Sequence, residues 1–407
     1  MTKFTTTPSA EAAGRTLAAP YLLGSDGRLR RNGVVRFAAD GTVLSVETEC
    51  ERIDSLPRTE YHNGILIPGM VNAHCHLELS CFRGAIPPQA GMVEFIRQVV
   101  SRRNDFPREV QIERAIEEDR TMWAEGIQAV GDISNDTTSF PAKTQALREG
   151  RTVYHTFAEY FGLPAEEEAE AFYHRTVDPL LTAGAEAGLV VTPTQHSTYF
   201  VSEKLFRLGA DSPRMSIHFM ETPAEVDFFD RRGGIYDLVT ASAGREPDFL
   251  RYGGHAERLV GSLPREAHLV LIHNTQMRRK DLDSILSHFE DVTFVLCPRS
   301  NYYIDADFPP ARMLLEAGAR VALGTDSLSS NTSLSLVEEV RWLAEHDPSL
   351  PLETMLLWAT LGGAQALGLG DCLGSFEPGK RPGAVLLSGV DFSTLRLTKD
   401  ARTVRLL

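Results

Sequence analysis

Eight short apolar runs alternate with helical stretches through the middle of the 407-residue chain. They read as strands because apolar and β-branched residues cluster in each run and turn residues bound it. These runs are residues 65–72, 127–134, 152–159, 189–195, 215–221, 268–274, 292–298 and 320–326. Helical periodicity between the strands is clearest in residues 107–125, 165–183, 280–289 and 333–345. One more helical stretch, residues 352–367, follows the last of the eight strands. Eight strands that alternate with helices predict an α/β fold, a closed (β/α)8 TIM barrel.

Both ends of the chain have a different pattern, in which short strand-like segments are separated by turn residues. Asn32-Gly33 and Asp40-Gly41 are typical turns of the N-terminal part, as Pro378-Gly379 and Pro382-Gly383 are of the C-terminal part. Neither part is long enough to bury much apolar surface alone. We therefore expect residues 1–64 and 374–407 to pair into one small β-sandwich domain, with residues 65–373 forming the barrel.

Bulk composition excludes several classes of partner. The chain has 41 Lys and Arg against 55 Asp and Glu, a formal charge of −14, so a surface for nucleic acid is not expected. Residues 1–8 lack the apolar core of a signal peptide, and no run approaches the ~18 apolar residues of a membrane span. Five scattered cysteines fit reduced thiols. We expect a cytoplasmic protein without a membrane partner.

Side chains that bind metals stand at the C-terminal ends of four predicted strands. His74 and His76 follow the first strand, and period-two alternation places both rings on one face. His218, His273 and Asp326 stand at the ends of three later strands. A single such residue is often only a helix cap or a turn former, but four strand ends that agree favour a site at the mouth of the barrel. His74, His76, His218 and Asp326 form a donor set suited to one divalent ion, Zn²⁺ or Fe²⁺.

Three strand-end residues, Glu221, His273 and Asp326, have the chemistry of catalysis. We expect Glu221 to act as the general acid/base that moves a proton of the attacking water to the substrate. His273 would stabilise the charge that develops at the attacked centre, and Asp326 would also accept a proton. The alternative for Glu221 is a solvated carboxylate in the first turn of the helix that Thr222-Pro223 opens.

A known family carries the same residues in the same order. The stretch from Pro68 to His76, His218-x-x-Glu221, His273 and Gly324-Thr325-Asp326 resembles the amidohydrolase superfamily, in the branch of nucleoside and nucleobase deaminases and chlorohydrolases. The resemblance implies a hydrolase that acts on carbon–nitrogen bonds, with the ligands and catalytic residues named above. It also implies a single metal, because no lysine follows the fourth predicted strand, which ends at Thr194-Gln195-His196-Ser197.

Narrower stretches are similar to the aminodeoxyfutalosine deaminases of menaquinone biosynthesis. They surround His76, His196, Asn301 and Asp326, although Gln195 and Thr198 stand where those enzymes carry prolines. The resemblance implies a purine nucleoside substrate, 6-amino-6-deoxyfutalosine, which is converted to futalosine and ammonia. Candidate substrate contacts are His196, which is as readily a structural histidine, and Glu159, Arg299 and Asn301. Arg299 would pair with a substrate carboxylate, but a loop arginine is more often structural.

Other functions stay open on the sequence. Alternatives within the same branch are deamination of adenosine, S-adenosylhomocysteine, methylthioadenosine or guanine. Dechlorination or amide hydrolysis of an N-heterocycle would use the same ligands. A barrel that serves only as an interaction module is disfavoured, because such a module has no need of the complete ligand set. Residues 228–262 form an insertion after the fifth strand, in which Arg231–Gly254 would be a lid or a homodimer interface.

Overall fold

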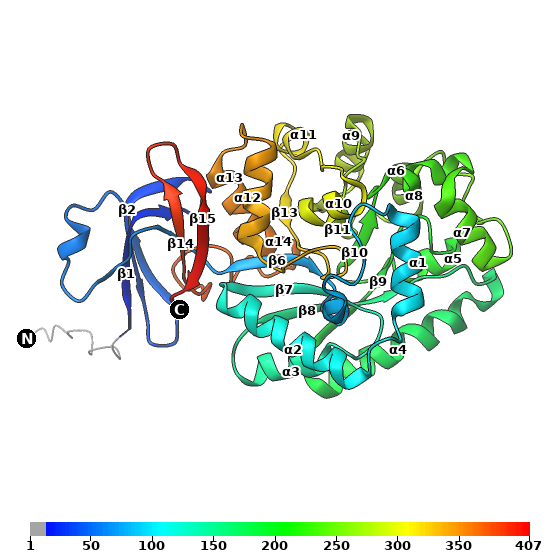
Figure 1. Ribbon diagram of the computed structural model, residues 1–407, viewed down its shortest axis with the longest axis horizontal. Coiled ribbons are helices and arrows are strands. Elements are labelled where there is room, and N and C mark those ends of the chain that lie inside the picture. Colours follow the sequence, from blue (N-terminus) through cyan, green and yellow to red (C-terminus); the bar gives the residue numbers. More distant parts are fainter. Residues whose placement is uncertain (1–13) are drawn as a thin grey trace, which may run out of the picture.

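Residues 14–407 are described by the computed structural model, in which a small β region lies beside a larger barrel (Figure 1). The absence of a signal peptide was predicted for residues 1–8, which lie outside the described part. In residues 14–407 no helix combines the length and the apolar character needed to cross a membrane.

The barrel is built from two four-stranded parallel sheets, with strand orders β6-β7-β8-β9 and β10-β11-β12-β13. The strands are β6 Met70–Cys75, β7 Ile127–Ser134, β8 Val153–Tyr160, β9 Val190–Gln195, β10 Met215–Phe219, β11 His268–His273, β12 Asp291–Leu296 and β13 Val321–Leu323. Single parallel bridges join the sheets at both seams, Cys75 with Asp326 and Ser197 with His218. The eight strands therefore close on themselves, and the predicted (β/α)8 barrel is confirmed.

Burial on both faces explains why these strands read as apolar runs. In β11 every residue from Leu269 to Ile272 is buried, as expected where side chains fill the barrel on one face and pack on helices with the other. Figure 1 shows the helices around the outside of the strands. They are α2 Arg108–Ala124, α3 Phe140–Arg148, α4 Ala169–Ala187, α5 Glu203–Leu208, α6 Pro223–Val226, α8 His255–Ser262, α9 Arg279–His288, α10 Pro298–Asp305, α11 Ala311–Glu316, α12 Leu336–His346, α13 Leu352–Leu357 and α14 Gly363–Ala366.

The first predicted strand, residues 65–72, is divided between the two parts of the molecule. Ile65–Ile67 (β5) pairs with strands of the β region, and the barrel strand β6 begins only at Met70. Pro68 and Gly69 form the break. A Cβ at position 69 would lie 2.5 Å from the Pro382 carbonyl oxygen, so only glycine allows this close approach. The sequence predicted the boundary before residue 65, and we propose that it lies in the segment after Ile67.

The two ends of the chain meet in one seven-stranded sheet. Its order is β15-β14-β5-β1-β2-β3, with β4 paired to β1. Its strands are β1 Thr16–Leu23, β2 Leu29–Phe37, β3 Val43–Glu47, β4 Glu60–Tyr61, β14 Val385–Asp391 and β15 Arg396–Arg405, together with β5. The C-terminal β14 pairs with β5 so that Leu386 lies opposite Leu66. The predicted pairing of the chain ends is confirmed, and we propose that this sheet is a domain separate from the barrel.

Two helices from different insertions pack together over one end of the barrel. Helix α1 (Met92–Arg102) follows β6, and helix α7 (Gly233–Ala243) follows β10. Met92, Phe228, Ile235 and Phe249 belong to one buried apolar cluster. Two short turns of 3₁₀ helix precede them, η2 (Leu77–Phe82) and η4 (Asp227–Asp230). Helix α1 was not predicted. Its signal in the sequence is the helical spacing of the apolar residues Val93, Ile96 and Val100, which is shorter than the helical pattern of the neighbouring residues 107–125.

Candidate metal centre and active site

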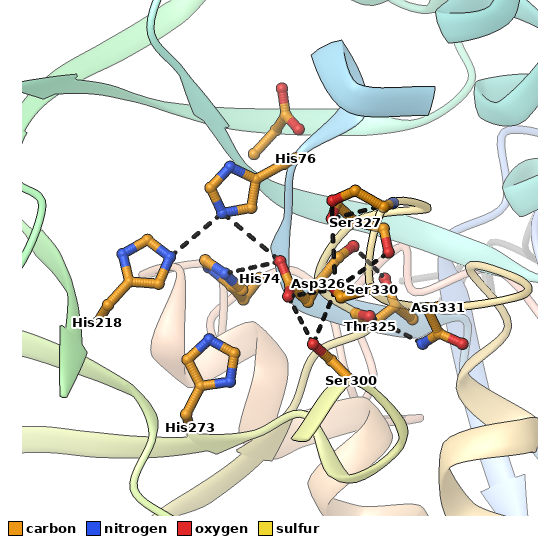
Figure 2. A network of polar contacts seen from close by, with 12 residues as sticks. His74, His76, His218, His273, Ser300, Thr325, Asp326, Ser327, Ser330 and Asn331 are labelled. Carbon is orange, nitrogen blue, oxygen red and sulfur yellow. Dashed lines mark hydrogen bonds and ion pairs between the residues drawn. The ribbon is translucent and has the colours of Figure 1, made fainter. Parts of the chain in front are cut away.

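Three imidazoles and one carboxylate converge at the C-terminal ends of the strands (Figure 2). The Nε2 atoms of His76 and His218 are 3.2 Å apart. Asp326 Oδ1 lies 3.6 Å from His76 Nε2 and 3.7 Å from His74 Nε2. The residues come from β6, from β10 and from the segment after β13, which the closed barrel brings to one rim.

The geometry fits a divalent metal ion. Four ligands at ~2.1 Å around a tetrahedral ion lie roughly 3.4 Å from one another, which is close to the distances above. Both ring nitrogens of His74 are buried without a hydrogen-bond partner among the described residues. Buried polar atoms without a partner are costly unless something binds them. The predicted ligands His74, His76, His218 and Asp326 therefore stand together as a set that can hold one ion.

Protonation of the ring nitrogens follows from burial and from one neighbouring carboxylate. Burial lowers the pKa of His76 to about 4, so the ring is neutral and able to coordinate a metal at neutral pH. Burial alone would also lower the pKa of His218, but the hydrogen bond and charge of Glu159 raise it to about 9, so a metal ion would have to displace the proton on Nε2 to bind there. Glu159 Oε1 lies 3.3 Å from His218 Nδ1, which also donates to the His196 carbonyl at 3.0 Å. These contacts orient Nε2 of His218 toward His76.

Two serine hydroxyls hold the carboxylate of Asp326. Ser300 Oγ and Ser330 Oγ donate to Oδ2 at 2.6 and 2.7 Å, which leaves Oδ1 facing the imidazoles (Figure 2). Partners of this kind fix the orientation of a metal ligand. Sequence reasoning missed both serines. The only signal for them is that polar residues crowd the segments after two neighbouring strands.

Glu221 and His273 form a second pair beside the metal ligands. Glu221 Oε1 lies 3.4 Å from His273 Nε2, and both side chains are buried. Burial raises the pKa of Glu221 well above its usual value and lowers that of His273 well below. Asn301 Nδ2 donates to His273 Nδ1 at 3.1 Å, which leaves the proton of the neutral ring on the nitrogen that faces Glu221. Glu221 is therefore not a solvated carboxylate in a helix turn, the alternative weighed for it.

The backbone at this rim is left-handed at several positions that are not glycine. Met220, His273 and Asp326 have φ of 49°, 72° and 56°. Each such residue costs free energy of order 1–3 kcal/mol, and such residues persist where the surrounding structure enforces them, often at functional sites. The strained positions coincide with the converging side chains.

A cavity opens from these polar groups toward the helices α1 and α7. Its apolar wall includes Phe95, Ile96 and Val99 of α1 and Ile235, Leu238 and Val239 of α7. Phe161 and Phe200 line another side, and their stacked rings have centroids 5.4 Å apart. His196 and Glu159, two predicted substrate contacts, also line the cavity. The insertion predicted as a lid or an interface thus forms part of the roof of the site.

The other two predicted substrate contacts do not line the cavity. Asn301 is buried against His273, as described above, and acts on that ring. Arg299 donates to Ser333 Oγ at 2.9 Å, and its Nη1 lies 3.8 Å from the buried carboxylate of Glu339. The prediction that Arg299 meets a substrate carboxylate is therefore not supported. Among the described lining residues Arg103 is the only Arg or Lys, and it donates to Glu78 Oε1 at 2.8 Å.

Comparison with known proteins agrees with this geometry. The model of the amidohydrolase family matches residues 65–405. The chain belongs to the amidohydrolase family. It is a hydrolase, as the sequence predicted, and the matched range includes all the residues predicted as ligands and catalytic groups.

Individual amidohydrolases are similar over most of their length. The 5-methylthioadenosine/S-adenosylhomocysteine deaminase of Syntrophobacter fumaroxidans is 29% identical over 346 residues, 78% of this chain and 70% of that protein. The structure of Helicobacter pylori aminofutalosine deaminase in complex with methylthio-coformycin has a TM-score of 0.78 at 22% identity, covering 96% of this chain and 97% of that one. Atrazine chlorohydrolase from Arthrobacter aurescens, complexed with zinc, has a TM-score of 0.69 at 20% identity, covering 93% and 90%. These structural similarities establish the common fold.

Proposed function

We propose that this amidohydrolase removes the 6-amino group of an adenine-type nucleoside by hydrolysis. The observation that carries the proposal is the position of the Glu221–His273 pair, 3.4 Å apart, beside the cluster of His74, His76, His218 and Asp326 at the floor of an apolar cavity. The names of the similar proteins, deaminases of adenine nucleosides among them, support the same reaction.

The donor set suits one divalent ion, for which we propose Zn²⁺ or Fe²⁺. His74, His76, His218 and Asp326 would hold it. When bound, such an ion supplies a Lewis acid that lowers the pKa of water from ~15.7 to ~7 and so provides a nucleophile at neutral pH.

The side chains around the ion divide the proton transfers. Glu221 takes a proton from the attacking water and delivers it to N1 of the purine ring as the new C–O bond forms at C6. His273 donates through Nε2 to the oxygen that is added, and Asp326 accepts the remaining proton of the water. Asp326 returns this proton to the exocyclic nitrogen, the C6–N bond breaks as the C6=O bond forms, and ammonia leaves. The apolar roof excludes bulk water, which strengthens these charge interactions.

The walls of the cavity favour a nucleoside with a bulky apolar substituent at the sugar end. The faces of α1 and α7 offer mainly aliphatic side chains, and Val100 and Phe161 at the cavity are 69% and 38% exposed. Such a substituent would remove that apolar surface from water. We propose 6-amino-6-deoxyfutalosine as the substrate, with His196 and Glu159 near the ribose. Arg103 replaces Arg299 as the candidate partner of a carboxylate on the substrate's substituent, because Arg103 lines the cavity, beside its contact with Glu78, whereas Arg299 does not line it.

Two predictions from the sequence lie beyond this proposal. A cytoplasmic location and a homodimer stay predictions from the sequence.

The test is a measurement of ammonia release by metal-loaded protein over a panel of substrates. The panel holds 6-amino-6-deoxyfutalosine, 5′-methylthioadenosine, S-adenosylhomocysteine, adenosine, guanine and a chlorinated triazine. The proposal predicts the highest kcat/KM for the first compound and measurable deamination of other adenine nucleosides. Chloride release without deamination would favour the alternative reaction, dechlorination of an N-heterocycle, and would overturn the proposal.

A further inference from the structure

The turn that carries Glu221 is held by a side chain outside the set described above. Strand β10 ends at Phe219, Met220 has a left-handed backbone, and the four-residue helix α6 begins at Pro223. A helix this short gains little stability from its own hydrogen bonds. Something else must therefore fix the direction in which Glu221 leaves the strand.

The carboxylate of Glu225 binds the backbone of this turn at two points. Oε1 accepts from the Met220 N–H and Oε2 accepts from the Glu221 N–H, both at 2.7 Å. Glu225 is 1% exposed, so water does not compete for these bonds. Hydrogen bonds to an ionised carboxylate are shorter and stronger than those between neutral groups. The two bonds fix the peptide groups on both sides of the Met220 Cα, next to Glu221.

Helix α8 of the insertion holds Glu225 in turn. His255 Nε2 donates to the Glu225 carbonyl oxygen at 2.9 Å, and His255 Nδ1 accepts from the Thr198 hydroxyl at 2.7 Å. Thr198 lies two residues beyond His196, in the segment that follows β9. The buried guanidinium of Arg258 also donates to the Thr198 carbonyl at 2.7 Å. Helix α8 thereby connects the turn that carries Glu221 with the segment that carries His196.

We propose that Glu225 is a positioning residue that fixes Glu221 for proton transfer, with His255 linking it to α8. The proposal rests on the function proposed for Glu221 above. Because the insertion residues that roof the cavity and the helix that holds Glu225 belong to one segment, 228–262, the same insertion shapes the cavity and positions the proposed acid/base.

The test compares Glu225→Gln with wild type as metal-loaded protein. The amide keeps the volume of the side chain, but its NH₂ group faces one of the two backbone N–H donors, so one bond is lost. Displacement of a reacting group by about 1 Å costs about 100-fold in rate, so kcat should fall about 100-fold. KM should stay within about threefold and metal content should be unchanged, because Glu225 touches neither the ligands nor the cavity.

Thr222→Ala is the matched control. Thr222 Oγ1 accepts from the Glu225 N–H at 3.3 Å, so this variant loses a bond in the same turn and keeps both bonds of the carboxylate. It should retain kcat within about twofold of wild type. An equal loss of kcat in both variants, or wild-type kcat in Glu225→Gln, would overturn the positioning role.

Two further measurements keep the proposal testable on other grounds. Hydrogen exchange followed by mass spectrometry should show faster exchange of the Met220 and Glu221 amides in Glu225→Gln than in Thr222→Ala, whatever the substrate proves to be. Unchanged exchange would contradict the proposal.

If Glu225→Gln does not fold, His255→Phe keeps an aromatic ring packed on Phe229 and removes both hydrogen bonds of the imidazole. It should lower kcat about tenfold with little change in KM, and wild-type kcat in this variant would also overturn the proposal. A wild-type protein that deaminates no nucleoside refutes the proposed function separately.

Discussion

At the scale of single residues, the side chains that can hold an ion are distinct from those that can move a proton, except for Asp326, which belongs to both groups. The Nε2 atoms of His76 and His218 and Oδ1 of Asp326 face one space, whereas Glu221 faces His273. Ser300 and Ser330 occupy the other oxygen of Asp326, so this carboxylate has one free oxygen to offer. The separation predicts that the two roles can be removed independently.

Glu221→Gln tests this separation. The variant should bind the same amount of metal as wild type, because the amide leaves the four ligands unchanged. Deamination should fall by about 100- to 10,000-fold, the usual contribution of a general acid/base. Metal analysis and steady-state kinetics on the same preparation provide the measurement. Near-normal turnover would remove Glu221 from the mechanism.

At the scale of elements, apolar runs were enough to predict where the barrel strands lie, because each is buried on both faces. Strand β7, Ile127–Ser134, was predicted at its observed bounds. The residues that we propose as ligands could also be singled out, since they lie at or just beyond the C-terminal ends of these strands. Contacts that depend on the exact path of a turn, or on packing between segments, could not. Glu225 and Ser330 look like ordinary polar loop residues until the fold brings them to Glu221 and Asp326, and Arg299 looked available until Glu339 and Ser333 were found beside it.

Helix α7 should determine which substituent the substrate carries. Leu238 is partly exposed and lines the cavity, so Leu238→Asp introduces a charge without burying it deeply. We expect KM for 5′-methylthioadenosine to rise about tenfold, because a tenfold change corresponds roughly to the free energy of burying two methylene groups. The rise in KM for adenosine should be smaller.

The matched control for this helix is Leu147→Asp. Leu147 belongs to α3 and is 53% exposed outside the cavity, so both values of KM should stay at the wild-type level. An equal rise in KM for the two substrates in Leu238→Asp would show that α7 does not contact the substituent.

At the scale of the whole molecule, the closure of the barrel is what makes the site. Residues 74 and 326 are far apart in the chain, yet the Thr325 and Asp326 amides both donate to the His74 carbonyl at 3.1 Å. The buried side chain of Asn72 adds two bonds to Thr325 across the same seam, at 2.8 and 3.1 Å. Any loss of global stability should therefore also open the metal centre.

Stability should fall in mild acid, in part through His155 of β8. Burial is the main cause that lowers its pKa from 6.5 to about 4 in the folded chain. Below pH ~6.5 the unfolded chain therefore binds a proton that the folded chain does not, and folding stability falls until the pH reaches the folded pKa. Between about pH 7 and pH 5 this one residue should cost roughly 2 kcal/mol of unfolding free energy.

Urea titrations of wild type and His155→Gln at both pH values measure this contribution. The variant loses the bond with Thr192 Oγ1 and should be less stable at neutral pH, but it should lose less stability on acidification. An identical loss in the two proteins would show that His155 does not titrate differently on unfolding.

The most direct test of the metal centre is anomalous diffraction from a crystal of the metal-loaded protein, measured at the absorption edge of the ion. We predict one strong peak per chain, about 2.0–2.3 Å from Nε2 of His74, His76 and His218 and from Oδ1 of Asp326. A peak at another place, or a site that Asp326 does not reach, would contradict the proposed centre and the deaminase reaction built on it.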